Sequence, residues 1–205
     1  LVLTVGTGST WAIRAALVLA MSGQEWQEQV FDLEDAKALA RLKRLAPAGL
    51  VPWLDHDGVR VHDSLAIAEY LYELCPDRQL YPASRAERAL ARSLCAEMHS
   101  GFGQIRSQLP FFLGAPTRSE PPVEAIGELA RLQTIWSQAR GPFYFGEEGI
   151  IDAFYGVMAY RLASYGIQLP GQAGVYQQAL LAWPLWQALL VKVRLQWPVA
   201  ARQPA

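Results

Sequence analysis

The sequence predicts an α/β region followed by an all-helical region, and three observations support this. Up to residue 76, short segments of strand character alternate with helical segments in the order βαβαββα. Beyond residue 76, apolar residues recur with helical spacing and strand signals are absent. Between the two regions, the segment PDRQLYPASR contains two prolines. We therefore predict a domain over residues 1–76, a linker over 77–86 and a helical domain over 87–205.

The first region begins with a predicted strand over residues 1–5 and a helix of small and aliphatic residues over 11–21. Ser22-Gly23 ends this helix, and residues 25–33 predict a second strand. Residues 35–45 predict a basic amphipathic helix, which must end before Pro47.

The next segment, VPWLDHDGVRVHDS, predicts a β-hairpin. Two short strands flank His56-Asp57-Gly58, and Asp-Gly is a frequent hairpin turn. A helix then begins at Ser64 and runs to Cys75, because Pro76 stops it. A β-α-β unit followed by a hairpin and a helix predicts a small mixed sheet covered by helices.

The second region reads as a series of helices. We predict them over residues 86–107, 122–139 and 150–165, and two shorter ones near 175–181 and 184–195.

Composition excludes several classes of protein. The chain has 205 residues, of which 52% are hydrophobic, and a net charge of -1, so it can form a core and is not disordered as a whole. Its charges are interspersed, so we expect neither a nucleic-acid partner nor a membrane surface. Cys75 and Cys95 have no metal-ligand spacing, and we expect buried free thiols in a reduced, cytoplasmic protein.

The segment TVGTGSTWAIR passes from a strand through two glycines into a helix. Ser9 lies at the predicted helix start, where free N–H groups and the helix dipole favour negative charge. Its hydroxyl could donate a hydrogen bond to a thiolate and so lower the pKa of the thiol. No His or acidic residue lies near it in sequence to make the serine itself a nucleophile. The alternative is a plain N-cap, which serine forms in many proteins.

Val51-Pro52 lies at the start of a predicted strand. One interpretation is an ordinary proline at a strand entry, where its missing N–H is tolerated. The other is a cis bond, which would leave the backbone N–H and C=O of Val51 free to pair with an extended ligand.

Asp63-Ser64 follows the hairpin as a further N-cap signal. The Ser64 hydroxyl and the next N–H groups could hold a carboxylate, and Asp63 could hold an ammonium group. Together they would suit the zwitterionic end of an amino acid, although a cap alone would also explain them.

In combination, these motifs resemble the cytosolic glutathione transferases. STWAIR is similar to the opening of the serine-type bacterial branch, GLVPWL to the cis-proline segment, and HDSLAIAEYL to the segment that holds the γ-glutamyl group. In the helical region, PFYFGEEGIIDAFY resembles the buried capping motif of the family, and AEMHSGF is similar to a motif of the same branch.

The resemblance implies a thioredoxin-like domain followed by a helical bundle. It also implies a reaction in which a glutathione thiolate attacks a small hydrophobic electrophile. Ser9 would donate to the thiolate, with Thr10 as the second candidate. Glutathione is a co-substrate in this interpretation, and no metal or prosthetic group is implied.

For the rest of glutathione, the resemblance assigns Val51 and Pro52 to the tripeptide backbone. It assigns Asp63 and Ser64 to the γ-glutamyl end. Because the family usually forms homodimers, a homodimer is implied as well.

The segment EMHSGFGQIRSQLPFF supplies a candidate pocket for the electrophile. Phe102 and Arg106 lie four residues apart, which places them on one face of the predicted helix, and Phe111 follows. The resemblance makes this helix a wall of the pocket, whereas core packing is the alternative for the aromatic residues. We expect His99 to be structural.

Three departures from the family pattern leave other functions open. Leu50 stands where relatives commonly have Lys or Gln, and Gly149 stands where they have a Ser or Thr cap. The Asn and Tyr of the serine-type branch are also missing before Ser9, where this chain has Thr7-Gly8 or nearby residues. The alternatives are a glutathione-dependent isomerase and a non-catalytic binding or regulatory protein that keeps the fold.

Overall fold

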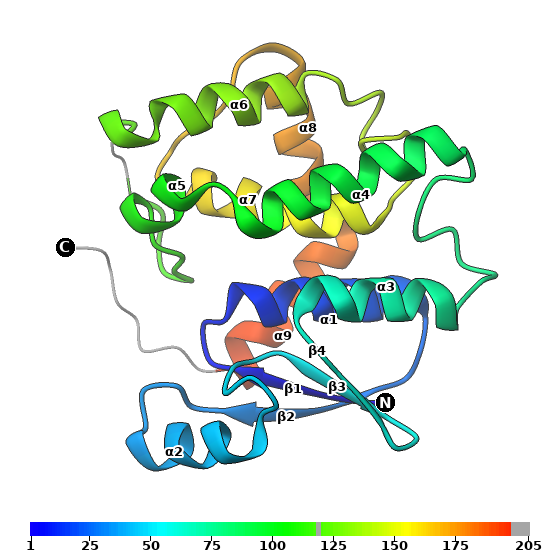
Figure 1. Cartoon of the computed structure of the whole chain (residues 1–205). Helices are drawn as coiled ribbons and strands as arrows, with labels where there is room; N and C mark the ends of the chain where they lie inside the picture. The colour runs from blue at the N-terminus through cyan, green and yellow to red at the C-terminus, as the bar shows by residue number, and fades with distance from the viewer. Residues whose placement is uncertain (118–119, 198–205) are drawn as a thin grey trace. The chain divides into compact units, whose positions relative to one another are not determined.

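A computed structural model describes residues 1–117 and 120–197 of the chain. The chain divides into two compact units. One contains Leu1–Leu80 together with residues 188–197, and the other contains Tyr81–Gln187. Figure 1 labels their helices and strands.

The first unit has the predicted order βαβαββα and a thioredoxin-like arrangement, which confirms the predicted fold class. Its elements are β1 (Val2–Gly6), α1 (Thr10–Ser22), β2 (Gln27–Phe31), α2 (Ala36–Leu45), β3 (Trp53–His56), β4 (Val59–His62) and α3 (Ser64–Leu74).

The four strands form one mixed sheet in the order β2-β1-β3-β4. β1 pairs with β2 in parallel, whereas β1 with β3 and β3 with β4 are antiparallel. The carboxyl ends of β1, β2 and β4 therefore lie at the same edge of the sheet as the amino end of β3. This edge carries the segments that the sequence singles out.

Helices cover the sheet of the first unit (Figure 1). α1 and α3 pack side by side, and α1 is buried almost all round, as its small and aliphatic residues predict. It begins at the N-cap Ser9 and ends at Gly23, whose positive φ of 68° suits a glycine. Leu42 of α2 and Ala46, the residue that ends this helix, pack with Phe31 and Trp53 in a small core of their own.

The second unit is helical, as predicted. Its elements are α4 (Arg85–Ser100), α5 (Gly103–Gln108), a 3₁₀ turn (Val123–Ala125), α6 (Ile126–Trp136), α7 (Ile150–Ser164), α8 (Gly171–Ala182) and the first residues of α9 (Pro184–Gln196).

The single helix predicted over residues 86–107 is wrong, because the chain breaks between α4 and α5. Phe102 has a φ of 59°, in the left-handed region that a helix cannot continue through. At Gly101, a Cβ atom would lie 2.8 Å from the carbonyl oxygen of Glu97. Glycine is therefore required at the break, and it also weakens a continuous helix.

Asp152 is fully buried in the first turn of α7. Its Oδ1 accepts hydrogen bonds from the Tyr144 N–H (2.9 Å) and the Tyr176 hydroxyl (2.6 Å). Its Oδ2 accepts one from the N–H of Gly149, the N-cap, at 2.8 Å. Burial raises the pKa of Asp152 to about 7, although these hydrogen bonds act in the opposite direction.

Residues 188–197 group with the first unit, whereas the sequence assigned them to the helical domain. The side chain of Glu28 on β2, only 7% exposed, accounts for the difference. It forms an ion pair with Lys192 (2.7 Å) and accepts a hydrogen bond from the Trp197 indole N–H (2.7 Å). The Trp26 indole N–H donates to the same carboxylate at 3.0 Å.

Cys75 and Cys95 are buried thiols that form no disulfide within the described residues, as predicted. Over residues 1–117 and 120–197, no helix combines the length and apolar character that crossing a membrane requires. Over the same residues, no cluster of three or more His, Cys, Asp or Glu side chains is placed to hold a metal ion.

Candidate functional site

One edge of the sheet brings together the three segments that the sequence singles out in the first unit. Ser9 follows the carboxyl end of β1, Val51-Pro52 precedes β3, and Asp63-Ser64 follows β4. The register places Trp53 between Thr4 and His62, so β3 lies between the other two strands. The N–H of Asp63 also donates to the carbonyl of Pro52 at 3.3 Å, which joins two of the segments directly.

Ser9 is the N-cap of α1. Its Oγ accepts a hydrogen bond from the Ala12 N–H at 3.3 Å, so the predicted cap is present. The hydrogen of its hydroxyl has no acceptor among the residues that the structure describes. A serine hydroxyl can donate and accept at once, so capping leaves Ser9 able to donate to a ligand.

Thr10 is the first residue of α1. It is 7% exposed and Ser9 is 9% exposed, so burial does not distinguish the two hydroxyls.

The turn before Ser9 is held by a residue that the sequence did not assign to the site. Ser9 N–H donates to Gly6 C=O at 3.1 Å, and Gly8 has a φ of 70°, as a type II turn requires. Thr7, within this turn, donates its N–H to the carbonyl of Phe31 at 2.9 Å. No local signal marks Thr7, because its contacts depend on strand pairing with residues more than twenty positions away.

Val51-Pro52 is a cis peptide bond, as predicted. In the part of the chain that the structure describes, the backbone N–H and C=O of Val51 have no hydrogen-bond partner. An extended chain could pair with these groups as an added strand would. The preceding Leu50 is 69% exposed.

The N-cap of α3 is Asp63, whereas the sequence pattern also allowed Ser64. Asp63 Oδ1 accepts the N–H groups of Leu65 (2.8 Å) and Ala66 (3.3 Å). The expectation that these N–H groups bind a ligand carboxylate is therefore wrong, because the protein's own carboxylate occupies them. Asp63 has a φ of 78°, an unusual value for a residue other than glycine, and strain of this kind often occurs at functional sites.

Ser64 is the first residue of α3, and its side chain is buried. Its Oγ has no hydrogen-bond partner within residues 1–117 and 120–197. An unpaired buried hydroxyl costs about 1–3 kcal/mol. A ligand oxygen that approached the start of α3 would recover this cost.

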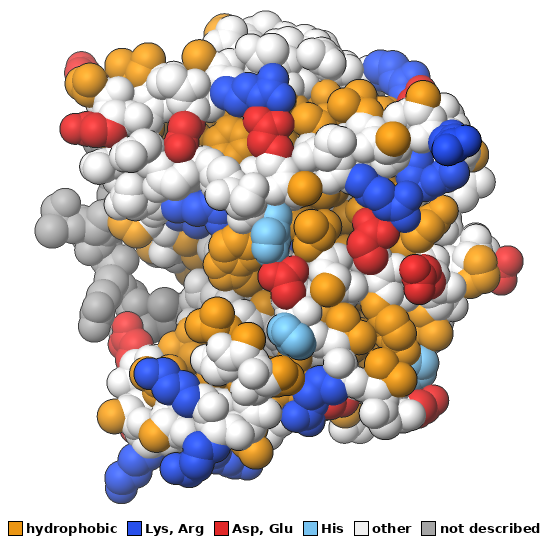
Figure 2. All heavy atoms as spheres, viewed as in Figure 1, with side chains coloured by type: hydrophobic (Ala, Val, Ile, Leu, Met, Phe, Trp, Pro, Cys, Tyr) orange, Lys and Arg blue, Asp and Glu red, His pale blue; other side chains and the backbone are white. Residues whose placement is uncertain are grey.

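The helix that comes after β2, α2, carries several Lys and Arg side chains. Figure 2 shows them gathered at the lower left of the molecule, over α2. They are exposed: Lys37, Arg41, Lys43 and Arg44. They give this part of the first unit a positive character.

The three predicted electrophile residues, Phe102, Arg106 and Phe111, lie in the second unit. Phe102 precedes α5 and is buried, so it does not share a helix face with Arg106. The Arg106 guanidinium donates to three carbonyl oxygens at the end of α4: Gly101 (3.0 Å), His99 (3.4 Å) and Met98. Burial lowers the pKa of Arg106. The arginine thus holds a helix end, where a cation is favourable.

Phe111 is half-buried and contacts the ring of Tyr160, with centroids 5.5 Å apart. Next to it, the buried Arg161 donates to the carbonyl of Leu109 at 2.7 Å. Burial lowers the pKa of Arg161 to about 10, and the charge of Arg106 contributes. These contacts fix the segment that carries Phe111. Its role toward an electrophile stays a prediction.

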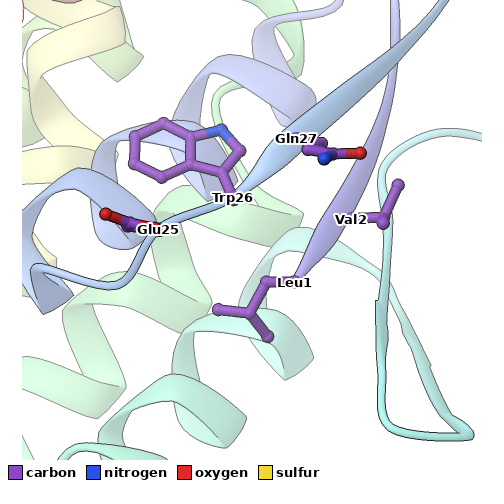
Figure 3. Close-up of a pocket in the computed structure, with 5 residues that line it drawn as sticks. All are labelled: Leu1, Val2, Glu25, Trp26 and Gln27. Carbon is purple, nitrogen blue, oxygen red and sulfur yellow. The ribbon is translucent and has the colours of Figure 1, made fainter.

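A pocket of about 390 Å³ lies at the opposite edge of the sheet. Its lining residues surround the start of β1 and the segment that enters β2 (Figure 3): Leu1, Val2, Glu25, Trp26 and Gln27. Because β1 runs from this pocket toward Ser9, the pocket is separate from the candidate site.

The chain is similar to known proteins over its first unit in sequence and over most of its length in fold. Residues 8–74 match the family model described as the N-terminal domain of glutathione S-transferase. The chain is 37% identical over 98 residues to a probable maleylacetoacetate isomerase of Caenorhabditis elegans, covering 48% of this chain and 45% of the relative. It is 40% identical over 88 residues to a maleylacetoacetate isomerase of Rhizobium meliloti, covering 42% and 41%. The chain thus matches less than half of the length of these curated relatives.

Among solved structures, the chain resembles a glutathione transferase homologue from Burkholderia with bound glutathione. The TM-score is 0.71 and the identity 26%, over 96% of this chain and 100% of the other. The family-model match thus covers residues 8–74, and the structural likeness extends over 96% of the chain.

Proposed function

We propose that the protein is a glutathione transferase that joins the glutathione thiolate to small hydrophobic electrophiles. One observation carries the proposal: a single sheet edge presents three unfilled hydrogen-bonding groups. These are the Ser9 hydroxyl hydrogen, the Val51 backbone and the Ser64 hydroxyl, each without a partner in the described part of the chain. A thiol tripeptide with a free amino-acid end has matching groups for all three.

In this mechanism, glutathione lies along the edge in an extended conformation. Its backbone pairs with the N–H and C=O of Val51, next to the cis bond to Pro52. Its γ-glutamyl carboxylate accepts a hydrogen bond from Ser64, and its ammonium group lies near the carboxylate of Asp63. The glutathione bound in the Burkholderia structure supports this choice of ligand.

Ser9 acts on the sulfur. Its hydroxyl donates to the thiolate, and the amino end of α1 favours the same negative charge. Both effects lower the pKa of the thiol, so that more thiolate is present at neutral pH. The thiolate then attacks an electrophilic carbon, and a carbon–sulfur bond forms. In a substitution, the bond to the leaving group breaks and the leaving group takes the electron pair. In an addition, the π-bond of the electrophile breaks and its electron pair moves to the neighbouring atom, which is then protonated. Thr10 is the alternative donor.

A glutathione-dependent isomerase is the second candidate, and the names of the two curated relatives favour it. In that reaction the carbon–sulfur bond would form and break again, so glutathione would be recovered. A transferase consumes one thiol for each product molecule. Titration of free thiol during turnover, with maleylacetoacetate and with a chloronitrobenzene as substrates, distinguishes the two.

The electrophile is expected to contact Phe111 and the region around Phe102 and Arg106 in the second unit. We also expect a homodimer, which light scattering coupled to gel filtration tests directly.

The decisive experiment measures the pKa of bound glutathione thiol by its ultraviolet absorbance in wild type, Ser9→Ala and Thr10→Ala. Loss of a charge-assisted hydrogen bond of about 1.5–3 kcal/mol should raise the thiol pKa by roughly one to two units. The conjugation rate at neutral pH should fall roughly ten- to hundredfold in Ser9→Ala, with glutathione affinity largely kept.

An unchanged rate in Ser9→Ala with a loss of rate in Thr10→Ala would show that Thr10, and not Ser9, donates the hydrogen bond to the thiolate. If the wild-type protein does not bind glutathione in calorimetry, the proposed function is wrong.

A further inference from the structure

We propose that Thr7 is a positioning residue for Ser9, which it holds in place by locking the turn before α1 to the end of β2. The inference rests on the proposed function and names a further residue of the same site. Thr7 lies two positions before Ser9 and is itself buried.

Three hydrogen bonds connect Thr7 to the last residue of β2 and to the segment that follows it. Its N–H donates to the Phe31 carbonyl at 2.9 Å. Its Oγ1 accepts the N–H of Leu33 at 3.0 Å and donates to Asp32 Oδ1 at 3.3 Å. The hydroxyl is therefore used both as donor and as acceptor, which fixes its orientation.

Asp32 completes the connection. The Oδ1 atom that accepts the Thr7 hydroxyl also accepts the N–H of Glu34 at 2.9 Å. Leu33, between them, packs closely over the turn, since a Cβ atom at Gly6 would lie 2.7 Å from its side chain. The turn and the end of β2 thus hold each other through hydrogen bonds and packing.

The orientation of Ser9 depends on this turn. Gly6, Thr7, Gly8 and Ser9 form the turn closed by the Ser9 N–H, and the φ of 70° at Gly8 leaves a flexible glycine between Thr7 and Ser9. Without an anchor at Thr7, the glycines on both sides would permit other turn conformations. The Ser9 hydroxyl would then no longer point in one direction, and a small misplacement of a catalytic group costs rate without costing ligand binding.

The test compares Thr7→Val, which keeps the shape and loses the hydroxyl, with Thr7→Ser, which keeps the hydroxyl. In Thr7→Val we expect the bound thiol pKa to rise and kcat to fall by roughly three- to thirtyfold, below the loss in Ser9→Ala, with the glutathione Kd little changed. Thr7→Ser should restore both. In the double variant Thr7→Val/Ser9→Ala, the rate should equal that of Ser9→Ala, because Thr7 acts through Ser9.

Asp32→Ala is a second variant at an exposed position, so it tests the proposal even if Thr7→Val folds poorly. It should shift the thiol pKa in the same direction. Glu34→Ala, which removes a neighbouring exposed charge and leaves the Thr7 contacts in place, is the matched control.

A loss in Ser9→Ala combined with wild-type thiol pKa and kcat in both Thr7→Val and Asp32→Ala would overturn this inference alone. Additive losses in the double variant would overturn it as well. No loss in Ser9→Ala would overturn it together with the role of Ser9 in the proposed function.

Discussion

Replacement of Asp152 by Asn should change the pH dependence of stability. The carboxyl group is fully buried at the start of α7 and accepts hydrogen bonds from Tyr144, Gly149 and Tyr176. Burial favours its neutral form, whereas the three donors favour its charged form. Burial is the larger effect and raises the pKa from 3.8 to about 7.

Whether stability rises or falls with pH follows from which state, folded or unfolded, binds the proton. Between pH 3.8 and about 7, the folded protein keeps a proton on Asp152 that the unfolded chain has released. The stabilisation is therefore complete below pH 3.8 and is lost as the pH rises toward 7. About three pKa units correspond to on the order of 4 kcal/mol over this range, and to on the order of 2 kcal/mol between pH 5 and pH 7.

Urea unfolding of wild type and Asp152→Asn at a series of pH values from about 5 to 8 measures this effect. The free energy of unfolding of the wild type, minus that of the variant, should fall between pH 5 and pH 7 by the amount given for that interval. The subtraction cancels the titration of distant groups. Asp35→Asn is the matched control, because Asp35 is an exposed N-cap and its difference should not fall in this way. A difference for Asp152→Asn that stays constant or rises with pH would show that the three donors outweigh burial, and would refute the reasoning.

The remaining predictions concern three polar residues. Ser64→Ala should leave the melting temperature unchanged or raise it, because the hydroxyl has no partner in the described part of the chain, yet it should weaken glutathione binding in calorimetry. Asp63→Ala should destabilise the protein by about 0.5–2 kcal/mol in urea unfolding, because it removes the cap of α3, and Asp63→Asn should recover most of this; equal stability of all three proteins would contradict the cap. Arg106→Met should lower the melting temperature by several degrees, through loss of its bonds to the end of α4, and a variant as stable as the wild type would contradict this role.

Much of the first unit could be predicted because its signals are local. The hairpin at Asp57-Gly58 and the ends of α2 follow from turn and cap residues within a few positions. Once the order βαβαββα is given, a mixed sheet brings the segments after β1 and β4 to one edge. That edge is where Ser9 and Asp63 lie.

Other features depend on backbone geometry that residue types do not reveal. Asp63 rather than Ser64 caps α3 because the chain enters the helix with a positive φ at residue 63. The helix over residues 86–107 looks continuous in its apolar spacing, and it breaks because Phe102 takes a left-handed conformation after Gly101. The contacts of Thr7 with Asp32 arise only when β1 and β2 pair in register.

The carboxylate of Glu28 has a consequence for the order in which the protein is made. Its partner Trp197 lies 169 residues later in the chain. At a synthesis rate of about 5–20 residues per second, the ribosome adds that partner roughly ten to thirty seconds after Glu28. During this interval the nascent first unit holds a carboxylate that still lacks both Lys192 and one of its indole donors. The unit whose strands are translated first is therefore completed last.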